Sequence, residues 1–252
     1  MLILYGKMAD VVARQKIGHI PISRMKYWYG DYFPEDRSFN CYSVDQFPNS
    51  HLPSHFHTQN QFQFFVRGTG TLGRSPHRLQ PYTIQYAGAY TGYGPIVSGD
   101  QGLQYITMRD RYDLRTMFIP RDRALLKPGP KTSWISKNIV PASKEVLFNL
   151  RSVEQLYFTN NDVKGMAVER IRIPRHSSHL LKAVDHASSM FAFVLQGSII
   201  WTNRTLEYLD VLFARVNMLP VEIRTNDHPA ELIVFFIPAN DPMYEESSHV
   251  QA

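Results

Sequence analysis

Cysteine is almost missing from this sequence of 252 residues, in which Cys41 is the only one. A single cysteine cannot form a disulfide within the chain, and it excludes a zinc site built from several cysteines. We expect Cys41 to be a small buried residue. The lack of disulfides favours a reducing, cytoplasmic location.

Long apolar runs are also missing. No segment approaches the roughly 18 consecutive apolar residues that a membrane-spanning helix needs, so we expect no membrane partner. The apolar start, MLIL, is short and Lys7 soon follows, so a signal peptide is not expected. With 44% hydrophobic and 19% charged residues, the composition is that of a globular protein.

Charge of one sign is not concentrated anywhere along the chain. The formal net charge is +5, and the densest basic stretch, residues 109–131, also contains Asp110, Asp113 and Asp122. We interpret this stretch as a solvated linker of mixed charge. Because no known nucleic-acid-binding motif accompanies it, we expect no nucleic-acid partner.

Short runs rich in Val, Ile, Phe and Tyr recur throughout, separated by Gly, Pro, Asn and Asp. This alternation is typical of β-sandwiches and β-barrels. The runs are FQFFV (62–66), YTIQYA (82–87), LQYITM (103–108), MAVERIRI (166–173), MFAFVL (190–195), SIIW (198–201), DVLFARV (210–216) and ELIVFFI (231–237). Helices are expected only at residues 9–16 and 142–150, so the pattern predicts an all-β protein.

The two halves of the sequence are similar to each other. PSHFH begins at Pro53 and PRHSS at Pro174, and FFVRG (64–68) matches FVLQG (193–197). Repetition of one strand–turn–strand unit indicates duplication. The segment KPGP (127–130) suits neither a helix nor a central strand, and we place the domain boundary near it, between residues 125 and 145. The expected domains are residues 1–130 and 131–252.

Two histidines are the strongest candidates for chemistry. In a strand, alternate side chains share a face, so His55 and His57 point the same way as Gln61, whereas Phe62 and Phe64 lie on the other face. Neutral imidazole is the commonest metal ligand, and two imidazoles on one face are aimed at one point. The alternative is that both histidines form hydrogen bonds within a polar interior.

The spacing His-x-His-x3-Gln-x6-Gly, from His55 through His57 and Gln61 to Gly68, resembles the first motif of the cupin superfamily. The resemblance implies a bicupin made of two tandem jelly-roll barrels with few short helices. It also implies a divalent transition metal (Fe, Mn, Ni or Zn) bound by His55, His57 and, more weakly, Gln61.

Gln61 stands where cupins carry a glutamate, so the site lacks that anion. A divalent ion held only by neutral groups keeps its full charge in a partly dry site. The metal affinity should therefore be lower than in the family. A small anionic ligand, such as a carboxylate, should be favoured as the missing ligand.

The second cupin motif is represented by Gly88, but Thr91 stands where the family has a histidine. The resemblance places residues 86–99 along the mouth of the barrel. Tyr90, Thr91 and Tyr93 are therefore the candidates for binding substrate or completing a metal shell. An aromatic rim or a dimer contact is the alternative.

The second half of the chain lacks a paired His-x-His. His176 corresponds to His55, but Ser178 takes the place of the second histidine, while His179 and His186 lie in an apparent insertion. We expect this barrel to be degenerate and to hold no metal.

The sequence GTGTLG (68–73) fits the pattern G-x-G-x-x-G of dinucleotide-binding loops. Such a loop needs a helix directly after it and an acidic residue about 20 positions later. Pro76 follows instead, and the next acidic residue is Asp100. We interpret this segment as a turn between strands.

Two functions are consistent with these features. The first is a metal-dependent enzyme of the dioxygenase, isomerase or decarboxylase type that acts on a small organic acid or aromatic compound. The second is a non-catalytic bicupin that binds or senses a small molecule, so whether the chain is an enzyme stays open. The apolar alternation of Phe62, Phe64 and Val66, and the habit of cupins to pair, predict a homodimer or a higher homo-oligomer.

Overall fold

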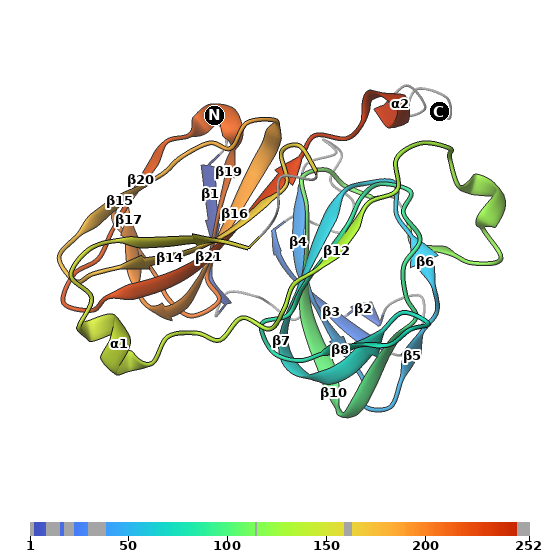
Figure 1. Ribbon diagram of the computed structural model, residues 1–252, viewed down its shortest axis with the longest axis horizontal. Coiled ribbons are helices and arrows are strands. Elements are labelled where there is room, and N and C mark those ends of the chain that lie inside the picture. Colours follow the sequence, from blue (N-terminus) through green and yellow to red (C-terminus); the bar gives the residue numbers. More distant parts are fainter. Residues whose placement is uncertain are drawn as a thin grey trace. The chain divides into compact units, whose positions relative to one another are not determined.

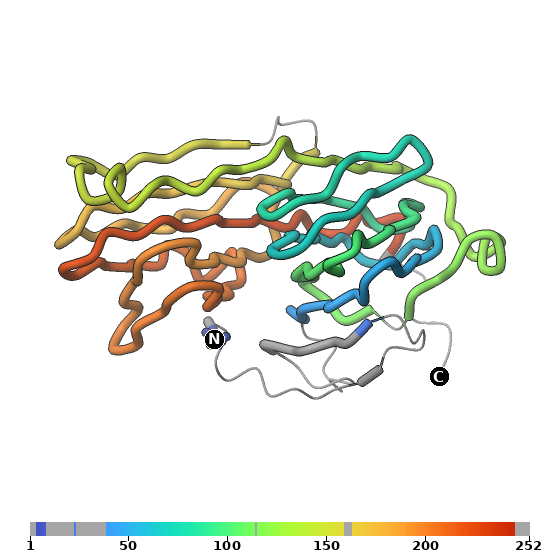
Figure 2. Tube along the Cα trace, turned by 90° about the horizontal axis from the view of Figure 1, so that it is seen from below, coloured from blue at the N-terminus to red at the C-terminus, as the bar shows by residue number. Residues whose placement is uncertain are grey.

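The structure is a computed structural model that describes residues 3–8, 16–17, 23–29, 39–113, 115–158 and 163–245. Strands dominate and the helices are short, so the predicted all-β class is confirmed (Figure 1). Figure 2 shows the course of the described residues as a tube along the Cα trace. Among the described residues, no helix is long and apolar enough to cross a membrane. Most of the helix expected at residues 9–16 lies outside them.

The chain divides into two compact units, and each unit is assembled from two separate segments. Unit 1 consists of residues 1–11 and 140–239, and unit 2 consists of residues 12–139 and 240–252. Each unit thus contains most of one half of the sequence and a short segment from the other half. Residues 1–11 belong to unit 1 and residues 240–252 to unit 2.

This division differs from the expected domains, 1–130 and 131–252. Strand β12 (Ser133–Ile135) pairs with β9 (Ile84–Ala87), so the chain remains in unit 2 beyond the KPGP turn. Strand β1 (Ile3–Gly6) pairs with β19 (Val211–Arg215) and so belongs to unit 1. Asn240 donates from Nδ2 to Oε1 of Gln59 at 2.7 Å, which attaches the C-terminal segment to unit 2.

Unit 2 is built on a nine-stranded sheet in the order β12-β9-β7-β10-β4-β3-β2, with β5 on β10 and β8 on β7, and on a two-stranded sheet of β11 and β6. Its further elements are β2 (Lys16–Ile17), β3 (Ser23–Tyr29), β4 (Asn40–Gln46), β5 (His51–Leu52), β6 (His55–Phe56), β7 (Gln61–Leu72), β8 (His77–Leu79), β10 (Ile96–Arg109), β11 (Met117–Phe118), the 3-10 helix η2 (Arg123–Leu125) and α2 (Pro242–Glu245). The paired strands are antiparallel.

Unit 1 contains a six-stranded sheet in the order β1-β19-β16-β21-β14-β13 and a four-stranded sheet in the order β15-β20-β17-β18. Its further elements are β13 (Glu154–Tyr157), β14 (Ala167–Ile173), β15 (Ser178–Leu181), β16 (Ala187–Gly197), β17 (Ile199–Trp201), β18 (Arg204–Leu206), β20 (Val221–Arg224), β21 (Ala230–Pro238), α1 (Lys144–Phe148) and the 3-10 helix η3 (Val216–Met218). Helix α1 lies within the predicted segment 142–150, and its N-cap Ser143 accepts from the amide of Val146.

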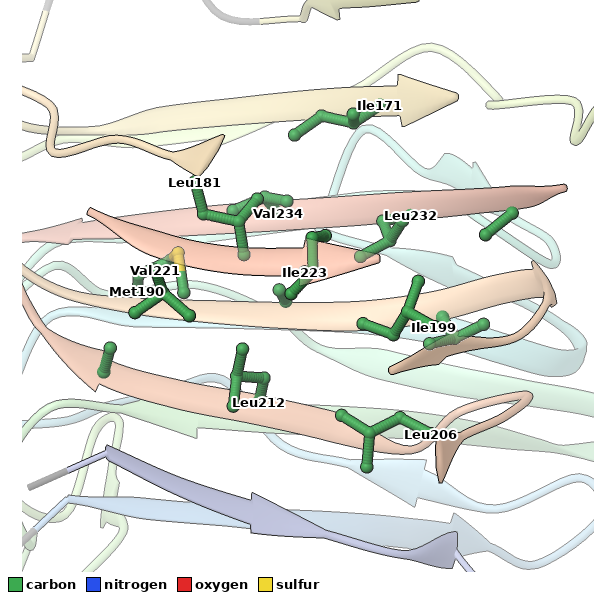
Figure 3. Packing of buried hydrophobic residues seen from close by; sticks show 14 of the residues in the cluster. Ile171, Leu181, Met190, Ile199, Leu206, Leu212, Val221, Ile223, Leu232 and Val234 are labelled. Carbon is green, nitrogen blue, oxygen red and sulfur yellow. The ribbon is translucent and has the colours of Figure 1, made fainter. Parts of the chain in front are cut away.

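The interior of unit 1 is hydrocarbon. Side chains from both of its sheets form one buried cluster (Figure 3). Leu232 and Val234 of β21 meet Ile223 of β20 in this cluster, and all three are fully buried. Alternation along each strand produces this layer, because every second side chain points to the same face.

The glycine-rich segment 68–73 is mostly strand. It forms the second part of β7 and ends in the turn to β8, with no helix after it, so it is not a dinucleotide-binding loop. Gly68 has φ +76°, and a Cβ there would lie 2.1 Å from the carbonyl oxygen of Gly102. Glycine is therefore required at this position of β7, where the chain passes the backbone of Gly102 in β10. Cys41 is buried, as expected.

Candidate functional site

The two histidines converge, although not on one continuous strand as predicted. Strand β6 ends at Phe56 and β7 begins only at Gln61. His55 forms a backbone bridge with Tyr93, and the amide of Thr58 bonds to the carboxylate of Asp113. The chain bends between the two strands, yet the rings of His55 and His57 remain 5.3 Å apart between centroids, at 88°.

The hydrogen bonds of His55 fix its tautomer. Nδ1 lies 2.8 Å from the carbonyl oxygen of Pro53, which can only accept, so Nδ1 carries the proton. Nε2 therefore has a lone pair, and it accepts from the hydroxyl of Tyr93 at 2.7 Å. This lone pair is the one that a metal ion would use.

His57 is held by a carboxylate. Its Nδ1 donates to Oδ2 of Asp113, while Oδ1 of the same carboxylate accepts from the hydroxyl of Thr58 at 2.6 Å. Nε2 of His57 has no hydrogen-bond partner among the described residues. An imidazole oriented by a carboxylate at one nitrogen is the usual arrangement of a metal-ligating histidine.

Gln61 is at the site but is fully engaged. Its Nε2 donates to the hydroxyl of Tyr93 at 2.5 Å. Its Oε1 accepts from Nη2 and Nε of Arg109 at 2.6 and 3.0 Å. Nη1 of Arg109 donates to the hydroxyl of Tyr42 at 3.0 Å. One connected network thus runs from His55 through Tyr93 and Gln61 to Arg109.

Burial shapes the electrostatics of this cluster, whose side chains are all below a tenth exposed. Burial, together with His57 and the charge of Arg109, lowers the pKa of His55 to about 3. Burial and Arg109 also lower the pKa of His57, against the effect of Asp113. Both imidazoles are therefore neutral at neutral pH, which is the form that binds metals.

Asp113 is the anion of the cluster. Burial alone would raise its pKa, but the interaction with His57, the charge of Arg109 and the hydrogen bond from Thr58 hold it below its usual value. The pKa of Arg109 is raised despite burial, because Tyr42 and Asp113 favour its charged form. Burial raises the pKa of Tyr93, so this phenol stays protonated.

Of the three residues expected to bind substrate, only Tyr93 reaches this cluster. Thr91 instead accepts from the amide of Thr132 at 3.1 Å. The Tyr90 ring packs against Tyr244 with centroids 4.8 Å apart. The backbone of Tyr93, two positions after Thr91, forms a bridge with that of His55. Tyr93 therefore lies beside the histidine, where the cupin motif had led us to expect Thr91.

Arg109 and Asp113 were missed because the sequence assigned residues 109–131 to a solvated linker. That interpretation is wrong for the start of the stretch, where Arg109, Asp110 and Asp113 are buried. One signal was available: Arg109 continues the alternation of Tyr105 and Thr107 and so lies on the same face of β10.

The histidines of the second half are not gathered into a comparable cluster. His176 is largely exposed and lies 3.5 Å from Asp227. His179 is half-buried, and burial and Lys182 lower its pKa. Across the described part of the chain, no group of three or more His, Cys, Asp or Glu side chains could hold a metal ion.

The residues of unit 2 fit a metal ion only in part. The two imidazoles fit, since an oxygen acceptor at each Nδ1 leaves the lone pair at Nε2. The lone pair of His57 has no partner among the described residues, whereas that of His55 accepts from the Tyr93 hydroxyl, which a metal ion would have to displace. Gln61 does not fit, because Arg109 holds its oxygen and Tyr93 its nitrogen. The nearby guanidinium also opposes a second cation.

No protein-family model matches the sequence, and no curated protein matches it either. Solved structures do match. Oxalate decarboxylase from Lactobacillus farciminis, in a formate complex, is 12% identical with a TM-score of 0.58, over 94% of this chain and 87% of that chain. A bacterial pirin from Escherichia coli, in complex with nickel(II), is 9% identical with a TM-score of 0.59, over 94% of this chain and 99% of that chain.

A variant of Bacillus subtilis oxalate decarboxylase is 10% identical with a TM-score of 0.57, over 94% of this chain and 78% of that chain. Another structure of the same enzyme is described by its Mn(II) centres. At this level of identity the likeness establishes the fold. The fold of this chain is the one shared by these oxalate decarboxylase and pirin structures.

Proposed function

We propose that unit 2 binds a divalent transition metal through Nε2 of His55 and His57, and that the protein is a metal-dependent enzyme acting on a small organic acid. The observation that carries this proposal is the orientation of both imidazoles. Each Nδ1 is held by an oxygen acceptor, Pro53 in one case and Asp113 in the other. Histidines are held in this way where they ligate metals.

The charge of the cluster favours an anionic substrate. In this cluster, Asp113 would be the negative charge that balances a divalent ion and the protonated Arg109. The ion would have no carboxylate ligand. A carboxylate from outside would supply the missing negative charge. When bound, the metal would act as a Lewis acid with open coordination positions. Formate in one structural neighbour and nickel(II) in another are in keeping with this proposal.

The remaining residues of the cluster have defined tasks. Asp113 orients His57, and the guanidinium of Arg109 attracts the anionic end of the substrate. The hydroxyl of Tyr93, which stays protonated, is the proton donor nearest to His55. These groups orient a substrate and place one proton at a defined atom.

The second candidate is a binding or sensing protein that holds no metal. It is favoured by the closed network of hydrogen bonds, in which the Tyr93 hydroxyl occupies Nε2 of His55 and Arg109 occupies Gln61. In that case the guanidinium would provide the only positive charge at the site.

Three further features belong to the same proposal. Each unit is a jelly-roll barrel, the barrel of unit 1 carries a degenerate site, and the protein is a cytoplasmic homo-oligomer. Phe62, Phe64 and Val66 are buried, so exposed apolar surface at these residues does not support association. Light scattering at micromolar concentration tests the oligomeric state, and a monomeric mass would contradict it.

Titration calorimetry with Ni²⁺ tests the metal site. We expect one ion per chain in the wild type, tighter binding when succinate is present, and none in the double variant His55→Ala/His57→Ala. The matched control is His176→Ala/His179→Ala in unit 1, which should bind as the wild type does. Equal loss in the control, or no metal in the wild type, would favour the second candidate.

A further inference from the structure

A row of polar side chains crosses the sheet of unit 2 next to the histidine cluster. In the register of the sheet, Gln63 of β7 lies opposite Gln85 of β9 on one side and opposite Thr107 of β10 on the other. Directly opposite residues share a face, with Cβ atoms about 5 Å apart. All three are buried, at 4%, 2% and 1% exposure.

Two acceptors of this row have no partner. Oε1 of Gln63 and Oε1 of Gln85 are both buried and have no hydrogen bond to any residue that the structure describes. Leaving a buried polar atom unpaired costs about 1–3 kcal/mol, and few such atoms are found in native proteins. Two of them on facing residues therefore call for a donor that the chain itself does not provide.

Arg109 lies on the same face of β10, two positions after Thr107. A guanidinium has five N–H donors, and the hydrogen bonds to Gln61 and Tyr42 use three of them. The other two have no acceptor among the described residues, and no carboxylate lies within ion-pair distance of the guanidinium. The row thus has two unpaired acceptors at one end, and at the other a guanidinium with two N–H groups that no described residue accepts.

The fold does not require this row. The corresponding interior of unit 1 is closed by aliphatic side chains, such as Leu212 of β19 and Val234 of β21. The row in unit 2 contains buried polar groups without partners, whereas the corresponding interior of unit 1 is aliphatic. Local exceptions of this kind are found at functional sites.

We propose that this row binds a small carboxylic acid that also carries a hydroxyl or amino group. The carboxylate pairs with the unused N–H groups of Arg109. The hydroxyl or amino group donates to the orphan oxygens of Gln63 and Gln85. This inference rests on the proposed function in naming the substrate class of the same site, but it does not depend on a bound metal.

Calorimetry and thermal shift with matched acids test the inference. The probes are lactate, malate and gluconate, each compared with the counterpart lacking hydroxyls: propanoate, succinate and hexanoate. We expect at least one hydroxy acid to bind at least tenfold more tightly than its counterpart. No binding by any of the acids, or equal binding within all pairs, overturns the inference.

Substitutions assign the effect to residues. The double variant Gln63→Leu/Gln85→Leu should lose the preference for the hydroxyl while still binding the simple acid, and Arg109→Met should lose both. Each single glutamine variant is tested as well, in case the double variant does not fold. Gln101→Leu, at an exposed position of the same strand as Arg109, is the matched control and should behave as wild type. Retained preference in the folded glutamine variants would contradict the assignment.

The two proposals fail separately. If Ni²⁺ binds at His55 and His57 but no hydroxyl preference is found, the metal site stands and the polar row is only hydrated. If a hydroxy acid binds through Gln63 and Gln85 while chelated protein binds it equally well and no metal is taken up, the inference stands and the metal proposal falls.

Discussion

The two units fill their interiors with different kinds of side chain. Unit 1 fills the space between its sheets with aliphatic side chains, and Leu212, Leu232 and Val234 are fully buried there. Unit 2 buries His55, Gln61 and Arg109 in a hydrogen-bonded network. Hydrocarbon burial stabilises a fold directly, whereas a buried polar network contributes only when every group is paired.

This difference is the reason why we propose the site in unit 2. A fold that can close its interior with hydrocarbon has no structural need for a guanidinium or for unpaired amides. Unit 1 therefore shows that the space between two such sheets can be closed with aliphatic side chains, whereas unit 2 buries polar side chains there.

The largest effect should come from a cavity in unit 1. Leu232→Ala removes a fully buried side chain from the aliphatic cluster, and we expect it to lower the free energy of unfolding by about 3 kcal/mol. Urea denaturation measures the change. Leu180→Ala, at an exposed position in unit 1, is the control and should change the free energy by less than about 0.5 kcal/mol. Equal effects would mean that the cluster is not the stabilising core.

The second largest effect should come from acid, which we expect to destabilise unit 2 more than unit 1. The folded-state pKa of His55, about 3, lies below its unfolded value, so the unfolded chain takes up the proton first as the pH falls. The contribution to stability is complete above about pH 6.5 and decreases down to about pH 3. At pH 4.5 we expect a loss of about 2–3 kcal/mol at roughly 1.4 kcal/mol per pH unit.

Hydrogen exchange of metal-free protein at pH 7 and pH 4.5 checks this expectation. Protection should fall more in the strands of unit 2 than in those of unit 1. The variant His55→Gln should flatten the dependence on pH. An equal loss of protection in both units would argue against a neutral, buried His55 as the cause.

A smaller effect is expected from Asp113→Asn. The amide oxygen can still accept from Nδ1 of His57, but the negative charge that balances Arg109 is lost. We expect the affinity for Ni²⁺ to fall about tenfold, as for other groups that orient a ligating histidine. Asp122→Asn, whose carboxylate pairs with Arg121 at the surface, should leave the affinity unchanged. An unchanged affinity in Asp113→Asn would show that the charge of this carboxylate does not contribute to metal binding.

The smallest effect should come from Gln61→Glu. A new carboxylate adds negative charge near His55 and His57, which tightens metal binding. Arg109, which already donates two hydrogen bonds to this side chain, neutralises most of that charge. We expect a gain of about threefold, or roughly 0.6 kcal/mol, by calorimetry. A hundredfold gain in metal affinity would show that Arg109 does not neutralise the new carboxylate at position 61.

The sequence predicts what depends on local pattern. The eight β-rich runs coincide with strands, for example ELIVFFI with β21, because alternation and β-branched residues act over neighbouring positions. The His-x-His pair also converges, as its spacing indicated.

What the sequence does not predict depends on pairing between distant segments. The burial of Arg109 depends on the register of β10 with β4 and β7, and Asp113 reaches His57 only after the chain has turned beyond β10. The choice between Thr91 and Tyr93 is made by the backbone bridge to His55. These are long-range properties, and no local pattern carries them.

The exchange of the chain ends has a consequence for how the protein is made. The amide of Met8 bonds to Asp210, which is 202 positions later, so this contact cannot form before Asp210 has been synthesised. Asn240 bonds to Gln59, which precedes it by 181 positions. Neither unit can therefore be completed from one half of the chain alone, and a cut near residue 140 yields two pieces that each lack a segment carried by the other.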